Sequence, residues 1–115
     1  MSQSDQDRDH RAATIAHLND KLRLNPGTGW VMTSGVHAKG VAFVAHAIAA
    51  VGAFNDFTDG DDLYGERDFG ALRLAGERLF WKIDYYDQAL ENGSPDPADE
   101  ALTRRVLTLM LASEY

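Results

Sequence analysis

The densest group of side chains that could do chemistry lies between residues 56 and 68, where the sequence reads DFTDGDDLYGERD. Carboxylates next to aromatic side chains suit a basic protein surface, because the aromatics can exclude water around the charges. We therefore expect an acidic–aromatic recognition surface here, with a solvated loop as the plainer interpretation. The segment holds six carboxylates and one arginine, hence a formal charge of −5; the expected contact residues are Asp56, Asp59, Asp61, Asp62, Tyr64, Glu66 and Asp68, beside Phe57 and Phe69.

The same carboxylates could instead bind a cation. Placing Gly60 at the sixth position of an EF-hand loop puts Asp59, Asp61 and Glu66 at positions that supply Ca²⁺ ligands. The third position is then Phe57, which cannot coordinate a cation. We expect no cofactor and no metal, and Ca²⁺ is the one ion that the spacing leaves open.

A second dense motif is the stretch from Trp81 to Asp87, which contains Lys82 and Asp84 two positions apart. In a strand these two side chains share one face and could pair with each other. Together with the carboxylates of residues 56–68 they form the alternative hypothesis, a metal-binding domain or an enzyme. Metal-dependent nucleases commonly carry an acidic residue two positions before the lysine, and here that residue is Phe80. The sequence also lacks a nucleotide-binding glycine motif and an HExxH pair. We assign no catalytic residue and expect a binding protein rather than an enzyme.

Composition restricts the class of protein further. The 115 residues include no cysteine, which excludes disulfides and thiol chemistry, and the formal net charge is −7. A negative chain gains nothing from counterion release on nucleic acid, so we expect no direct nucleic-acid binding and instead a basic or nucleic-acid-binding protein as partner. No signal peptide or apolar run of membrane-spanning length is visible, which predicts a cytoplasmic protein without membrane contact. A homodimer through a hairpin face around Phe80 also stays open.

Periodicity and turn residues predict an α+β fold. A polar, flexible N-terminus (residues 1–10) precedes a single domain (11–115). We expect a small, mainly antiparallel, three-stranded sheet packed against about three helices in the order α-β-α-β-β-α. The expected elements are a helix around residues 15–22, a strand at 30–33, a helix at 41–51, a hairpin at 69–85, a short helix at 87–92 and a last helix from 96 to about 110.

The hairpin is predicted in most detail. Gly76 favours a type II′ turn over Gly76-Glu77, because its first central position needs a positive φ. That register places Leu74 opposite Leu79 and predicts one buried face. The last helix is predicted from Asp96 as N-cap, Pro97 at the first position, and an apolar face of Leu102, Val106, Leu109 and Met110.

Several strings of the sequence resemble one bacterial family, the domain of unknown function DUF3768. The resemblance covers roughly residues 14–115. It implies no activity and no catalytic residue, but it implies a setting on plasmids and other mobile DNA of alphaproteobacteria, often near anti-restriction-type genes. An accessory protein that acts on a host or plasmid protein, of an anti-defence type such as an anti-restriction or anti-CRISPR inhibitor, is the expectation that follows. The matching strings are residues 51–57, 64–70, 80–87, 93–97 and 105–115, with Gly35-Val36.

Overall fold

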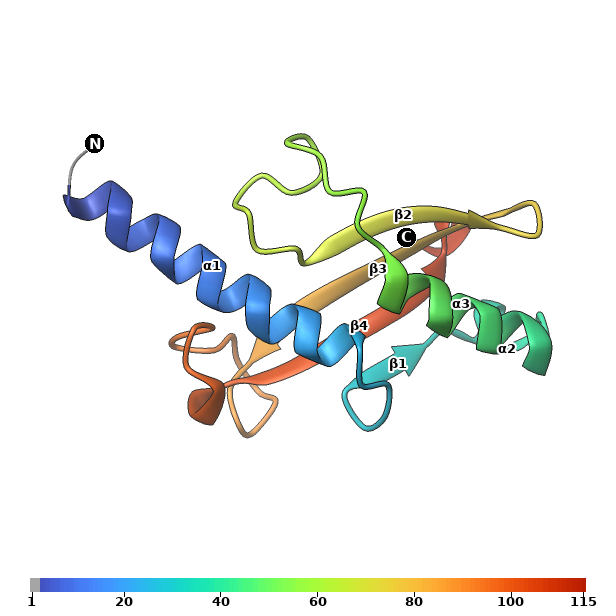
Figure 1. Cartoon of the computed structure of the whole chain (residues 1–115). Coiled ribbons are helices and arrows are strands. Elements are labelled where there is room, and N and C mark those ends of the chain that lie inside the picture. The colour runs from blue at the N-terminus through green and yellow to red at the C-terminus, as the bar shows by residue number, and fades with distance from the viewer. Residues whose placement is uncertain (1–2) are drawn as a thin grey trace.

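The computed structural model describes the backbone of residues 3–115, with side chains from residue 6 onward, and it confirms an α+β fold (Figure 1). Three α-helices, four strands and two 3₁₀ turns follow one another in these residues. They are α1 (Gln3–Arg23), β1 (Trp30–Met32), α2 (Ser34–His37), α3 (Val41–Ala53), β2 (Phe69–Leu74), β3 (Glu77–Tyr86), η1 (Glu100–Leu102), β4 (Arg104–Leu111) and η2 (Ala112–Glu114).

The sheet has four strands in the order β1-β4-β3-β2. Strand β3 pairs antiparallel with both β2 and β4, while β1 pairs parallel with β4. We expected three strands in a mainly antiparallel sheet; the structure has a fourth strand, and the sheet is mixed because β1 is parallel to β4. The additional strand is β4, which lies at the centre of the sheet.

Residues 104–111 form this central strand, so the predicted last helix is wrong. The run Val106-Leu-Thr-Leu-Met-Leu111 is apolar at almost every position, so its leucines fit a helical period as well as the period of a strand. The predicted N-cap Asp96 accepts a hydrogen bond from the Ala98 amide at 3.1 Å without starting a helix. The first helical turn begins later, where Asp99 accepts from the Ala101 amide and starts only the 3₁₀ turn η1. The predicted helix at 87–92 is also absent, and those residues form turns.

The predicted hairpin is confirmed, with a different turn. Leu74 pairs with Glu77, and Leu72 rather than Leu74 lies opposite Leu79. Ala75 and Gly76 are the central turn residues with φ of 50° and 82°, which is the pattern of a type I′ turn. A shift of two residues leaves every side chain on its predicted face, because strand side chains alternate with a period of two.

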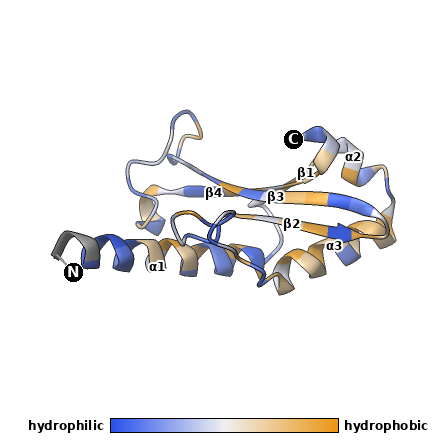
Figure 2. Ribbon diagram, turned by 90° about the horizontal axis from the view of Figure 1, so that it is seen from above, coloured by the Kyte–Doolittle hydropathy of each residue, from blue (hydrophilic) through white to orange (hydrophobic). Residues whose placement is uncertain are grey.

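Helices α1 and α3 both lie on one side of the sheet (Figure 2), and the core fills the space between them. Trp81 lies in the centre of the covered face, fully buried, with Leu109 beside it on β4. Its indole packs over Gly70 on β2, where a Cβ atom would lie 2.3 Å from Trp81 Nε1. A glycine at residue 70 is thus required by the close approach of the ring.

Helix α1 begins at Gln3, so residues 3–10 of the predicted flexible N-terminus are helical, and residues 1–2 lie outside the described part. The first half of α1 projects beyond the edge of the sheet (Figure 1). None of the helices in residues 3–115 is long and apolar enough to cross a membrane.

Candidate functional site

The acidic loop (residues 54–68) joins α3 to β2 and is anchored by two aromatic side chains. Phe54 and Phe57 pack edge-on against each other, with ring centroids 5.0 Å apart. Both rings also meet Trp81, at 5.6 and 6.1 Å respectively. Phe57 is therefore part of the core packing and not a free anchor for a partner, and Phe69 packs against Phe80 on the other face of the sheet.

A buried arginine at the end of α1 holds the start of the loop. Arg23 is only 5% exposed, and its guanidinium donates hydrogen bonds to the carbonyls of Val51 (2.8 Å) and Phe54 (2.9 Å). These carbonyls end α3, so the cation satisfies a helix C-terminus and its dipole. Asp20 accepts a further bond from Arg23 at 2.8 Å and also pairs with Arg67. Residues 20 and 23 were not among the sequence candidates, because only the fold brings α1 beside the end of α3.

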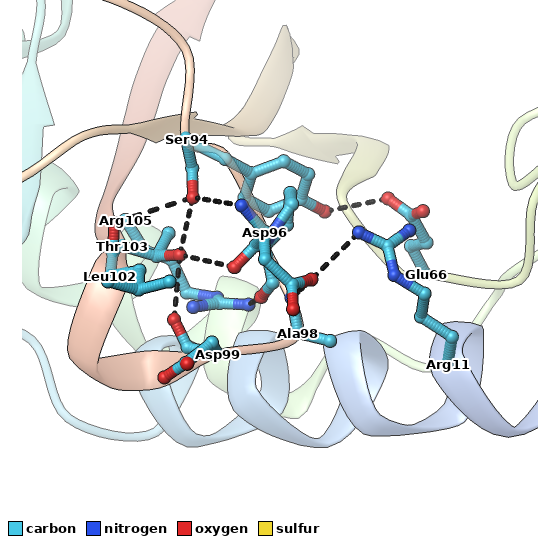
Figure 3. A network of polar contacts seen from close by, with 11 residues as sticks. Arg11, Glu66, Ser94, Asp96, Ala98, Asp99, Leu102, Thr103 and Arg105 are labelled. Carbon is cyan, nitrogen blue, oxygen red and sulfur yellow. Dashed lines mark hydrogen bonds and ion pairs between the residues drawn. The ribbon is translucent and has the colours of Figure 1, made fainter.

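Glu66 points inward, to a polar network under the loop (Figure 3). The Tyr85 hydroxyl donates to Glu66 Oε1 at 2.9 Å and accepts from the fully buried Asn19 at 2.8 Å. Asn19 also donates to the Glu66 carbonyl at 3.0 Å and accepts from Arg105 Nε at 2.9 Å. Burial raises the pKa of the Tyr85 phenol and lowers the pKa of the Arg105 guanidinium. Glu66 thus bonds both Tyr85 and Asn19 within the fold, which makes it a structural residue.

Asp68 lies at the entry to β2, where its carbonyl accepts from the Ile83 amide at 2.8 Å. Partial burial raises the pKa of its carboxyl group, and the nearby charge of Glu66 adds to the shift. Within the loop, the Arg67 amide donates a hydrogen bond to Asp62 Oδ1 at 2.9 Å. The Asp62 side chain thus has a local structural role, whereas Asp68 contributes its main-chain carbonyl.

The remaining loop residues face the solvent. Asp56, Asp59 and Asp61 are exposed, and Leu63 and Tyr64 are 74% and 76% exposed. Hollows of 400 and 410 Å³ separate this tip from α1, and Tyr64 lines both. An exposed leucine and tyrosine among carboxylates form the outer surface of the loop.

Lys82 and Asp84 do not join the loop. They project from the sheet face opposite the core, where Lys82 Nζ lies 3.1 Å from Asp84 Oδ2. The predicted EF-hand ligands also diverge, because Glu66 bonds Tyr85 while Asp59 and Asp61 stay exposed. In the described residues no group of three or more His, Asp or Glu side chains could hold a metal ion.

The acidic loop and most of the sheet lie in the part of the chain that matches a protein-family model. A family model described as "Protein of unknown function (DUF3768)" matches residues 32–114. The chain belongs to this family. The matched region contains the whole acidic loop and strands β2 to β4, whereas Asn19, Asp20 and Arg23 on α1 precede it. No curated protein and no solved structure matches the chain.

Proposed function

We propose that the chain is a non-enzymatic, protein-binding accessory factor that presents the outer surface of the acidic loop to a basic partner protein. The observation that carries the proposal is the exposure of Leu63 and Tyr64 beside Asp56, Asp59 and Asp61. Exposed apolar side chains supply binding energy when a partner covers them, and the surrounding carboxylates select a basic surface.

The fixed geometry of the loop supports this proposal. Phe54, Phe57 and Glu66 attach both of its ends to the core, and Arg67 ties it to α1. A loop held in one conformation loses little entropy on binding, so its contacts contribute more to affinity. The proposed partner is a basic or nucleic-acid-binding protein. In the mobile-DNA setting that the family resemblance implies, it would be a host or plasmid protein, and inhibition of a defence protein is the proposed outcome.

A photo-crosslinking capture tests the proposal. A benzophenone amino acid at residue 64 should crosslink a basic protein in lysate of the native host, and Asp59→Asn/Asp61→Asn should reduce the yield at least about fivefold. Asp62 is left in place because it bonds the Arg67 amide. The matched control is Glu91→Gln/Glu100→Gln, which removes two exposed charges elsewhere and should leave the yield unchanged. Equal capture by both double variants would rule out the loop as the contact surface.

A further inference from the structure

One face of the sheet has no helix across its middle in the described residues. Helices α1 and α3 cover the other face, while α2 with η2 and the 87–103 connection lie at the two ends (Figure 2). Strand register identifies the side chains on this open face, because those opposite the core alternate with Trp81 and Leu109. They are Val31, Phe69, Ala71, Arg73, Arg78, Phe80, Lys82, Asp84, Tyr86, Arg104, Val106 and Thr108, with the buried Met110 at the end of β4.

The open face is basic in an acidic chain. It carries four cations and one carboxylate, a formal charge of +3, so that the rest of the chain carries −10. Lys82 forms an ion pair with Asp84, the one carboxylate of this face. Arg73, Arg78 and Arg104 have no ion pair among the residues that the structure describes.

Two of these arginines are placed against each other. Arg73 and Arg78 are direct cross-strand partners in the hairpin, and like charges at such positions repel. Asp56 lines a hollow with both at the edge of β2 but pairs with neither. A bound anion would remove the repulsion. The arrangement therefore favours a negatively charged ligand on this face.

Aromatic rings lie among the cations. Phe80 carries the Arg78 guanidinium 5.2 Å above its ring, and Phe69 and Tyr115 surround it with centroids 5.4 and 5.3 Å away. Tyr115 is 76% exposed, and Tyr86 lies on the same face beside Arg104. Aromatic side chains and arginines on an open four-stranded sheet can stack bases while the cations contact phosphates.

We propose that the open face binds single-stranded nucleic acid. An acidic protein segment would pair with the arginines through charge alone, whereas the phosphates and bases of a single strand use the arginines and the rings together. A two-fold dimer through this face would place the basic surface on itself, since such a dimer apposes identical surfaces. The net charge of −7 was the reason to expect no nucleic-acid binding. It is the sum of +3 on the open face and −10 on the rest of the chain, so it does not describe the open face. The proposal does not depend on the exposed Asp59 and Asp61 of the acidic loop, although Asp56 near the start of that loop lines the edge hollow with Arg73 and Arg78.

Fluorescence anisotropy at 20 mM NaCl tests the proposal with labelled 12-residue oligo(U), oligo(dT) and oligoglutamate. We expect binding of at least one oligonucleotide, which also identifies the sugar, and at least about tenfold weaker binding of oligoglutamate. Arg73→Ala/Arg78→Ala should weaken binding about tenfold and reduce the salt slope by about 1.4. Tyr86→Leu should weaken it about fivefold or more through lost stacking.

The matched control is Arg11→Ala/Lys21→Ala, which removes two exposed cations from α1 and should change affinity less than about twofold. Asp59→Asn/Asp61→Asn should retain binding, which separates this proposal from the protein-binding one. Each variant is first checked for a cooperative melting transition no lower than that of the parent protein. Absence of oligonucleotide binding, equal affinity for oligoglutamate, or equal weakening by the α1 control would overturn the proposal. So would light scattering that shows a dimer strengthened by Arg73→Ala/Arg78→Ala.

Discussion

Glu66 and Asp59 are both acidic residues of one loop, and their surroundings give them different roles. The Glu66 carboxylate accepts from the Tyr85 hydroxyl, and its carbonyl accepts from buried Asn19. Asp59 is exposed, and its carboxylate bonds no described residue. Removing the Glu66 carboxylate would leave the half-buried Tyr85 hydroxyl with one fewer partner, whereas Asp59 can change without cost to the fold.

Asp68→Asn should stabilise the protein at neutral pH. A raised pKa in the folded state means that the folded chain holds the proton more tightly than the unfolded chain does. Stability therefore falls as pH rises from the ordinary value of 3.8 through the raised pKa, and the whole loss is present above it. The asparagine avoids this loss. We expect a gain of about 0.5 kcal/mol in the unfolding free energy at pH 7, kept small by solvent screening, and no gain at pH 3.

Urea unfolding of both proteins at pH 3 and pH 7 measures this difference. Asp59→Asn is the control for a general reduction of the loop's negative charge. A gain as large at pH 3 as at pH 7 would show that the charge of Asp68 is not its cause.

The sequence predicts some residue roles and not others. The dense carboxylates located the loop, and the ion pair of Lys82 with Asp84 followed from their spacing of two. The inward turn of Glu66 could not be predicted, because its partners Asn19 and Tyr85 lie 47 and 19 positions away along the chain. Such contacts depend on the packing of α1 on the sheet, which no local pattern records.

Among the secondary-structure elements, β4 shows where sequence patterns become ambiguous. The hairpin was predictable because a turn glycine and alternating side chains agree, and only the turn type differed. In residues 106–111 every side chain but Thr108 is apolar, so neither a period of two nor one of 3.6 stands out. The partners that decide the matter, β1 and β3, are separated from β4 along the chain.

Leu107→Ala and Leu102→Ala distinguish the strand from the predicted helix. In the structure Leu107 is fully buried in the centre of the sheet, and Leu102 is 44% exposed. We expect Leu107→Ala to cost about 2–5 kcal/mol and Leu102→Ala less than about 1 kcal/mol in urea unfolding. The helix would bury Leu102 with Val106 and turn Leu107 outward, so the opposite ranking would contradict the observed strand.

At the scale of the whole molecule, the fold separates charges that are mixed along the chain. Arg73 and Arg78 follow the acidic loop by only a few positions, yet they belong to the open face of the sheet. Net charge alone therefore gave an incomplete expectation about partners. The separation also concentrates negative charge in the loop and on the rest of the surface, where it opposes folding.

Salt should therefore stabilise the protein. Raising NaCl from 20 to 500 mM shortens the screening length from about 20 Å to about 4 Å, which weakens repulsion between exposed carboxylates. The exposed ion pairs Arg11–Asp96 and Lys21–Glu100 weaken too, but such pairs contribute little. We expect the melting temperature to rise by about 2–4 °C, as for a stabilisation of roughly 0.5 kcal/mol.

Two double variants serve as controls for the source of the repulsion. The melting temperature of Asp59→Asn/Asp61→Asn should rise less with salt, because the loop has lost part of its repulsion. The melting temperature of Glu91→Gln/Glu100→Gln should follow that of the parent protein more closely. Calorimetry in NaCl measures all three, and a melting temperature that falls with salt would show that attraction, not repulsion, dominates the surface.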